Sequence, residues 1–294
     1  MLSRKQFDIL TLIEKTGQKL SQRTIAATLD ISLGTVNKIL AELTKDGYLQ
    51  DGMITDEGLH ILEPYRVKRL LIFAAGFGSR LVPVTLNTPK PLVRVKGKRI
   101  IDTLLDAACN ADIEEIYIVR GYLGEQFDQL LSKYPSIKFI ENPSYNEENS
   151  ISSAMRARHL IANAYVCDAD LLIYNPELIT RYQYQTNYLG VPVERTDDWC
   201  LHTRNGVITK MCLGGTNCYH MFGISYWNEE DGSRLIRDIE EVYRSPGGRE
   251  RYWDQVALEY RSRNYHVTVR PCRFSDIVEI DTYQELKQID SSYI

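Results

Sequence analysis

The chain has 294 residues, enough for two domains of ordinary size. Hydrophobic residues make up 44% of it and charged residues 25%, so we expect a packed globular core and exclude collagen, coiled coil and low-complexity sequence. The net charge of −4 provides no global field to hold polyanions or anionic lipid, so any contact with nucleic acid must be local.

Targeting and redox signals are sparse. No stretch approaches about 18 uninterrupted apolar residues, and the opening of the chain lacks the apolar region of a signal peptide. The sequence therefore predicts a cytoplasmic protein that does not engage a membrane. The six cysteines include no C-x-x-C pair, which in a reducing compartment favours small buried hydrophobic side chains over a disulfide or zinc framework.

Residues 1–64 show three short amphipathic helical patterns followed by a hairpin signal. Ser21 and Ser32 stand where helix N-caps are expected, and Asp51-Gly52 is typical of a two-residue hairpin turn. Only Asp30-Ile31-Ser32 links the second and third patterns, which fits a helix-turn-helix. The apolar residues at helical spacing are Phe7, Leu10 and Ile13, then Ile25, Ala26 and Leu29, then Val36, Ile39, Leu40 and Leu43.

This first domain resembles the winged helix-turn-helix domains of bacterial transcription regulators. The resemblance implies DNA as a partner, with Thr35, Asn37 and Lys38 on the exposed face of the third helix. The net charge of this domain argues against DNA binding, because residues 1–64 carry 7 Lys and Arg against 9 Asp and Glu. Contacts with phosphate groups supply most of the affinity for DNA. A packing or dimerisation module stays an alternative, and the sequence leaves open whether the chain is a homodimer.

The second domain, residues 67–294, begins with a strand and a glycine loop. The run Arg69–Ala75 has the length and apolar character of a buried parallel strand. Gly76 and Gly78 after it let a ligand approach the backbone closely, and Arg80 indicates that this ligand is anionic. The loop fits neither the dinucleotide-binding fingerprint nor the phosphate loop of NTPases.

The longer stretch around this loop resembles the signature of nucleotidyltransferases, which join an NTP to a phosphorylated acceptor. The resemblance implies that the loop wraps the triphosphate, that Arg80 neutralises the β- and γ-phosphates and that Lys90 reaches the α-phosphate. Fixed cations suit this chemistry because negative charge grows around the phosphorus in the transition state. The matching residues are Ala74, Ala75, Gly76, Phe77, Gly78, Ser79, Arg80, Leu81, Pro83, Thr85, Thr88, Pro89, Lys90, Pro91 and Leu92.

Helical and strand patterns alternate downstream. This alternation predicts an α/β domain, Rossmann-like, with a mostly parallel mixed sheet, helices on both faces and a ligand at the carboxyl ends of the strands. The expected helices are 100–110, 124–131 and 150–160, and the expected strands are 113–120, 137–140 and 165–167.

Carboxylates end two of the strand-like runs. Asp168 and Asp170 stand at i and i+2, so both can point to one side, and a second run ends in Glu279-Ile280-Asp281. Mg²⁺ takes carboxylate, water and phosphate oxygens, so such residues suit an NTP site. Ordinary turn chemistry is the alternative.

The second domain also resembles one branch of the family, the bacterial CTP:phosphocholine cytidylyltransferases, over residues 67–290. The resemblance implies that Asp170 and Asp281 hold Mg²⁺ and that Trp199 and Tyr252 line the acceptor pocket. The segments that carry it are 165–170, 198–199, 223–227, 252–254 and 279–281.

An aromatic pocket makes physical sense for choline, since a quaternary ammonium has no N–H to donate and binds through aromatic faces. Asp254 could add a complementary charge or cap a helix, and aromatic residues of α/β domains also serve as core. For the base and sugar we expect Asn149, Ser150 and Ser153, although these could equally be loop and cap residues. Cytosine and uracil are not distinguished.

These features predict Mg²⁺-dependent transfer of CMP from CTP to phosphocholine, giving CDP-choline and pyrophosphate. Phosphoethanolamine, 2-aminoethylphosphonate and a sugar 1-phosphate are alternative acceptors. A transcription regulator that senses CTP or a choline metabolite is the alternative from another class. The presence of Lys90, Asp170 and Asp281 favours the enzyme.

Overall fold

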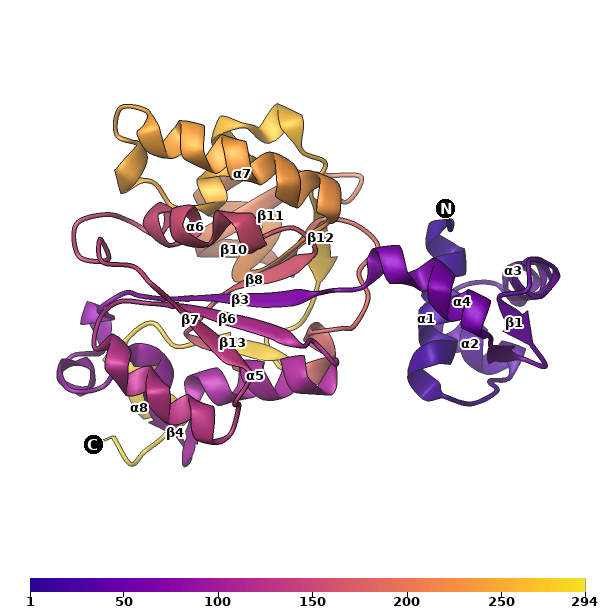
Figure 1. Cartoon of the computed structure of the whole chain (residues 1–294), viewed down its shortest axis with the longest axis horizontal. Helices are drawn as coiled ribbons and strands as arrows, with labels where there is room; N and C mark the ends of the chain where they lie inside the picture. The colour runs from indigo at the N-terminus through magenta and orange to yellow at the C-terminus, as the bar shows by residue number, and fades with distance from the viewer. Residues whose placement is uncertain (294) are drawn as a thin grey trace. The chain divides into compact units, whose positions relative to one another are not determined.

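A computed structural model gives the fold of residues 1–293, which form two compact units (Figure 1). The first unit contains residues 1–66 together with residues 182–184 from far along the sequence. The second contains residues 67–181 and 185–293. Across residues 1–293, no helix combines the length and the apolar character that a membrane crossing requires.

The first unit has the predicted three helices and hairpin. The Ser21 and Ser32 hydroxyls accept hydrogen bonds from backbone amides three residues ahead, as N-caps do. Asp51 and Gly52 have φ values of 53° and 81°, which a tight hairpin turn needs. The elements are α1 (Arg4–Thr16), α2 (Gln22–Leu29), α3 (Leu33–Lys45), β1 (Leu49–Gln50), β2 (Met53–Ile54) and an unpredicted α4 (Asp56–Leu62).

Residues 182–184 complete the core of this first unit. The Tyr184 ring stacks on Tyr65 with 5.6 Å between centroids and packs against Phe7 at 5.3 Å. Its hydroxyl donates a hydrogen bond to the Leu2 carbonyl over 3.0 Å, and Tyr182 is buried in the same cluster. The first unit therefore depends on a segment that lies more than a hundred residues downstream of its other elements.

The second unit is built on a seven-stranded mixed sheet with the order β10-β12-β11-β8-β3-β6-β7. Strands β8, β3, β6 and β7 are parallel, and β11 joins antiparallel to β8. The predicted mixed, largely parallel sheet is confirmed. The strands are β3 (Arg69–Ala74), β6 (Glu115–Arg120), β7 (Ile137–Glu141), β8 (Ala164–Asp168), β10 (Asn187–Arg204), β11 (Val207–Trp227) and β12 (Thr268–Pro271).

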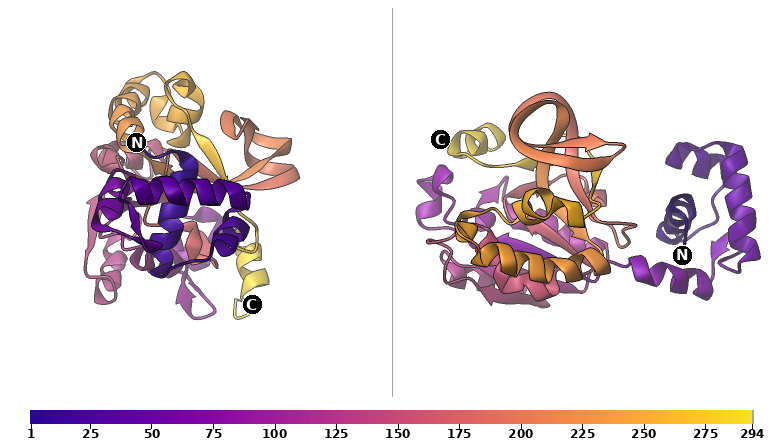
Figure 2. Two further views of the ribbon diagram at one scale, coloured as in Figure 1. Left: turned by 90° about the vertical axis from the view of Figure 1, so that its right-hand side faces the viewer. Right: turned by 90° about the horizontal axis from the view of Figure 1, so that it is seen from above.

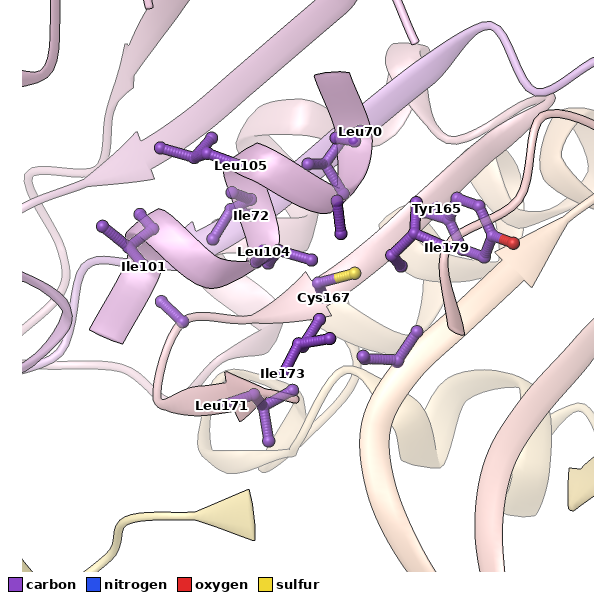
Figure 3. Packing of buried hydrophobic residues seen from close by; sticks show 14 of the residues in the cluster. Leu70, Ile72, Ile101, Leu104, Leu105, Tyr165, Cys167, Leu171, Ile173 and Ile179 are labelled. Atoms are coloured by element: carbon purple, nitrogen blue, oxygen red, sulfur yellow. The ribbon is translucent and has the colours of Figure 1, made fainter. Parts of the chain in front are cut away.

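Helices cover both faces of this sheet (Figure 1). Because side chains alternate along a strand, Leu70 and Ile72 of β3 pack toward α5 (Ile100–Asn110), as Figure 3 shows. Leu71 and Phe73 belong to the opposite cluster, with α6 (Ile151–Ala157) and α7 (Glu229–Arg244). Both faces of β3 are buried, which explains its continuous apolar sequence.

Smaller elements surround the sheet. A two-stranded ribbon joins β9 (Leu171–Ile173) to β13 (Ile277–Glu279) in antiparallel pairing, and α8 (Tyr283–Ile289) follows it. A second ribbon consists of β4 (Arg94–Val95) and β5 (Lys98–Arg99). Through the pairing of β9 with β13, the chain that follows β8 lies next to the C-terminal segment. Both segments contribute residues to the site described below.

The described cysteines are free thiols, but they are not all buried hydrophobic side chains. Cys109 is exposed and Cys212 is half-buried. Cys200 and Cys212 lie side by side with 3.8 Å between their sulfur atoms. The expectation of buried hydrophobic side chains is therefore wrong for Cys109 and Cys212.

Candidate active site

A cavity of about 460 Å³ opens at the carboxyl ends of β3 and β8. Parallel α/β sheets bind their ligands at this edge. Gly78, at φ 68°, makes room for the side chain of Lys90, since a Cβ there would stand 3.0 Å from the Lys90 Cβ. The lining residues are Phe73, Ala74, Gly76, Gly78, Ser79, Arg80, Lys90, Pro91, Asn149, Asp168, Ala169, Asp170, Tyr252 and Asp281.

Lys90 is the buried cation of the cavity, with 8% of its surface exposed. Its ammonium donates to Asp170 over 2.7 Å and to Asp281 over 3.1 Å. Burial opposes the charge, but these two carboxylates outweigh it and raise the pKa of Lys90. Arg80, which is largely exposed, also reaches Asp281 over 2.6 Å. The cavity is thus lined by one buried cation, Lys90, and one exposed cation, Arg80.

Three carboxylates meet beside Lys90. Oxygen atoms of Asp170, Glu279 and Asp281 lie within 4.8 Å of one another. The pairing of β9 with β13 brings them together, because the Ile280 amide donates to the Asp170 carbonyl over 3.1 Å. Burial and the charges of Asp170 and Asp281 raise the pKa of Glu279 well above its ordinary value. A bound cation would relieve this repulsion.

Sequence reasoning missed Glu279 as a member of this cluster. The signal was present, because residues 279 and 281 are at i and i+2 and therefore face the same side of an extended chain. Asp281 itself is held by Glu285, whose carboxylate accepts the Asp281 and Thr282 amides over 2.8 Å each.

Asp168 stands apart from the three-carboxylate cluster. Burial and then the charges of Asp170 and Asp254 raise the pKa of its carboxyl well above the ordinary value. It occupies space that Gly223 of β11 leaves open, since a Cβ at Gly223 would collide with the Asp168 carboxylate.

Tyr252 lines the cavity and contacts a second aromatic residue, Trp199, which is not among the lining residues. The Trp199 and Tyr252 rings form an edge-to-face pair with 5.7 Å between centroids, and Tyr252 is 46% exposed. Asp254, two residues after Tyr252, accepts a hydrogen bond from the Tyr188 hydroxyl over 2.8 Å. Asp254 is not among the residues that line the cavity.

The structure brings Asn149 to the cavity, but it gives Ser153 and Ala75 other partners. Asn149 donates to the Glu250 carbonyl over 3.2 Å. Ser153 is buried and accepts a hydrogen bond from Asn142 over 3.1 Å. Ala75 is buried too, and its carbonyl accepts the Tyr122 amide over 3.0 Å.

The buried Asp254 carboxyl makes stability depend on pH. Burial raises its pKa to about 6 from an ordinary 3.8, so the folded protein favours the neutral form. The resulting stabilisation is complete below pH 3.8 and is lost as the pH rises through about 6. In Asp254→Asn the amide oxygen can still accept the hydrogen bond from Tyr188, but the side chain does not titrate. As the pH rises from 4 to 7, we expect the free energy of unfolding of this variant to increase by on the order of 2 kcal/mol relative to that of the natural chain.

Urea unfolding at a series of pH values measures this difference. Asp197→Asn, which changes a carboxylate with an 88% exposed side chain, is the control and should follow the natural chain across the range. If the free energies of unfolding of Asp254→Asn and the natural chain differed by the same amount at every pH, the expected pH dependence would be wrong.

Comparison with known proteins identifies the class of this fold and site. Residues 69–189 match the family model for nucleotidyl transferases, and residues 2–50 match the model for winged helix-turn-helix DNA-binding domains. The 2-aminoethylphosphonate cytidylyltransferase of Lancefieldella rimae is 33% identical over 76% of this chain and 92% of its own length. The choline-phosphate cytidylyltransferase of Streptococcus pneumoniae is 28% identical over 76% of this chain and 96% of its own length.

A solved structure agrees with these relatives. That of the CTP:phosphocholine cytidylyltransferase from Streptococcus pneumoniae superposes with a TM-score of 0.72 at 29% identity, covering 78% of this chain and all of the other. The chain belongs to the nucleotidyltransferase family, with a winged helix-turn-helix ahead of the catalytic fold. The relatives named here are cytidylyltransferases.

Proposed function

We propose that the chain transfers CMP from CTP to a small phosphate or phosphonate bearing a cationic amine, with phosphocholine as the first candidate acceptor. The observation that carries this proposal is Lys90, buried between Asp170 and Asp281 beside the glycine loop. A nucleotidyl transfer needs a fixed cation at the α-phosphate and metal-binding carboxylates next to it, and this arrangement offers both.

The three-carboxylate cluster fits Mg²⁺. Asp170, Glu279 and Asp281 supply hard oxygen donors, and the buried Oδ1 of Asp170 has no hydrogen-bond partner within the described residues. When bound, Mg²⁺ would neutralise phosphate charge and orient the triphosphate. The carboxylates themselves hold Lys90 in place and keep it protonated, so Lys90 acts as a cation and not as a base.

The proposed step is an in-line displacement. An oxygen of the acceptor phosphate attacks the α-phosphorus of CTP, a new P–O bond forms, and the bond to the β-phosphate oxygen breaks to release pyrophosphate. Lys90 stabilises charge at the α-phosphate, while Arg80 and the amides of Gly76 to Ser79 hold the leaving group. The acceptor needs no side-chain base because a phosphate monoester is largely dianionic near neutral pH.

The pair of Trp199 and Tyr252 supports phosphocholine. A trimethylammonium group gains from aromatic faces, at about 0.5–2 kcal/mol per contact, and sheds its hydration easily. The Tyr252 ring lies on the cavity, and Trp199 meets it edge to face.

2-Aminoethylphosphonate is the second candidate. It is favoured by the relative from Lancefieldella rimae, which at 33% identity exceeds the 28% of the choline-phosphate enzyme over the same 76% of this chain. A primary ammonium needs hydrogen-bond acceptors, and since Asp254 does not line the cavity, these would have to come from the residues that do.

The decisive test is pyrophosphate release by the full chain, with each of four NTPs crossed against phosphocholine, phosphoethanolamine, 2-aminoethylphosphonate and a sugar 1-phosphate. We expect CTP with phosphocholine to give the highest kcat/KM, by at least about tenfold over phosphoethanolamine. A preference for 2-aminoethylphosphonate would transfer the proposal to the second candidate. No turnover of any pair with Mg²⁺ would favour a sensing role.

The same assay tests the aromatic pair. We expect Trp199→Ala to raise the KM for phosphocholine by about tenfold and to shrink the preference over phosphoethanolamine, with the KM for CTP unchanged. Trp199→Phe keeps an aromatic face and should retain most of the preference. Tyr174→Ala, which removes another exposed ring, is the matched control. Equal losses for both acceptors in Trp199→Ala would show that Trp199 does not select the acceptor.

DNA binding by the first unit is a separate proposal. Asn37 and Lys38 are exposed on α3, whereas Thr35 is half-buried and its hydroxyl bonds to Ser32 over 2.8 Å. The net negative charge of residues 1–64 means that such binding would depend on few phosphate contacts. A fluorescence-anisotropy titration with genomic DNA fragments, comparing the natural chain with Lys38→Glu, measures it.

A further inference from the structure

Three cysteines and a histidine converge on the long hairpin of β10 and β11. The sulfur atoms of Cys200 and Cys212 and a ring nitrogen of His202 lie within 4.8 Å of one another. The two sulfur atoms are 3.8 Å apart, and the Cys218 thiol is close to that of Cys200. None of these residues lines the cavity of the proposed active site.

Strand pairing places the first three donors on one face. Figure 2 shows the hairpin curling back over itself, so that this part of β10 has β11 on both sides. On one side Cys200 stands directly opposite Cys212. Residues opposite each other in an antiparallel pair share a face, and so do residues two apart on one strand, which adds His202 to the face of Cys200.

The pairing on the other side of β10 adds Cys218. There Cys200 stands opposite His220. Because the strands are antiparallel, two steps forward along β10 correspond to two steps back along β11, which brings Cys218 opposite His202. All four donor side chains therefore project from the same face of the curled hairpin.

Gly215 leaves the space among these donors open. A Cβ on Gly215 would stand 2.7 Å from the Cys200 sulfur, 3.1 Å from the His202 Nε2 and 3.2 Å from the Cys218 sulfur. Any other residue there would fill the point on which the donors converge. The glycine thus preserves a small space bordered by soft ligand atoms.

The hairpin around this space has little core of its own. Among hydrophobic residues from 192 to 218, the buried ones are Cys200, Leu201, Met211 and Cys218. With so few buried side chains, this part of the hairpin has little hydrophobic core to stabilise it. Two of the four buried residues are themselves among the converging donors.

We propose that Cys200, His202, Cys212 and Cys218 bind one Zn²⁺ in a closed, structural site. Zn²⁺ prefers four thiolate and imidazole ligands in tetrahedral geometry, and at a Zn–S length of about 2.3 Å two such sulfur atoms are about 3.8 Å apart. The spacing between Cys200 and Cys212 matches. Binding would release the thiol protons and add the free energy of coordination to the stability of the hairpin.

This site goes beyond the proposed transfer reaction but touches it at one point. Trp199 precedes Cys200 on β10, so its side chain projects from the opposite face, where it meets Tyr252. Zn²⁺ on one face would hold in place the strand that presents the aromatic residue on the other.

Metal content of the full chain tests the proposal directly. We purify the natural protein under reducing conditions, without a metal-binding tag, and measure zinc by plasma mass spectrometry. We expect about one zinc per chain, released by a mercurial thiol reagent. Replacement by Co²⁺ should give the intense visible bands of tetrahedral cobalt and a thiolate charge-transfer band. A chain that holds no zinc after growth with added zinc, or whose mass after alkylation reveals a Cys200–Cys212 disulfide, would overturn the site.

Variants assign the ligands. Cys212→Ser and His202→Ala should each retain less than about a tenth of the zinc, whereas His202→Cys should keep it. Cys109→Ser changes a thiol outside the cluster, and Asp170→Ala changes the carboxylate cluster, so both should bind zinc as the natural chain does. Zinc that persists in a Cys212→Ser, Cys218→Ser double variant, or that disappears in Asp170→Ala, would contradict the assignment. If the double variant does not fold, the zinc content and the cobalt spectrum of the natural chain determine whether the proposed site exists.

Discussion

Asp170→Ala and Asp281→Ala are each expected to lower kcat by about 10²- to 10³-fold with the protein still folded, because positioning and charge neutralisation supply most of the catalysis in nucleotidyl transfer. Both carboxylates border Lys90 and lie in the three-carboxylate cluster. Initial rates of pyrophosphate release at saturating CTP and several Mg²⁺ concentrations measure the effect. Part of the loss should be recovered at high Mg²⁺, since a site that lacks one ligand still binds the ion weakly.

Asp168→Asn is the matched control for these variants. Asp168 is the last residue of β8, and the pKa of its carboxyl is raised. Because it does not belong to the three-carboxylate cluster, the variant with a neutral side chain of the same shape should retain most of the activity. Glu279→Gln should behave like the cluster variants if Glu279 is a ligand. Near-normal turnover in folded Asp170→Ala or Asp281→Ala would refute the metal assignment, and circular dichroism with thermal melting establishes folding.

Lys90→Ala is expected to reduce kcat by about 10²-fold while the KM for CTP changes by less than about threefold, because the contact of Lys90 with the α-phosphate strengthens as charge develops. Lys90→Ala also removes the buried aliphatic stem, so Lys90→Met, which removes the ammonium but keeps the packing of the stem, is the second variant. Steady-state kinetics with both substrates varied provides both constants.

Lys98→Ala removes a half-exposed cation that pairs with Asp106 and is not part of the cavity, so it serves as the control and should have normal kinetics. If Lys90→Ala and Lys90→Met raise the KM for CTP without lowering kcat, Lys90 contributes to ground-state binding and the proposed role in the transition state is wrong.

Local chemistry explains which parts of the fold the sequence could predict. The caps at Ser21 and Ser32, the Asp51-Gly52 turn and the apolar run of β3 depend on neighbouring residues alone, and the structure contains them as expected. The glycine loop was predictable for the same reason, since positive φ at Gly78 and the packing of Lys90 against it are properties of one short segment.

Features that need two distant segments were not predictable. Glu279 joins Asp170 only because β9 pairs with β13, and the three cysteine ligands proposed for zinc meet only because β11 curls around β10. Their spacing along the chain matches no local metal motif. Ser153 illustrates the reverse case, since this polar residue, expected near the base, lies buried in α6 with its hydroxyl bonded to Asn142. The roles of the site residues therefore stay predictions for the experiments above.

The tyrosines at positions 182 and 184 limit how the two units can be separated. The chain leaves the first unit at residue 66, re-enters it for residues 182–184 and leaves again, so a single cut does not divide the protein into its units. A fragment that ends at residue 66 would lose the Tyr184 ring, which stacks on Tyr65 and packs against Phe7. Deletion of residues 1–66 would leave Tyr182 and Tyr184 exposed to water. Transferring the first unit to another protein would therefore require residues 182–184 to be transferred with it, although they lie within the sequence of the second unit.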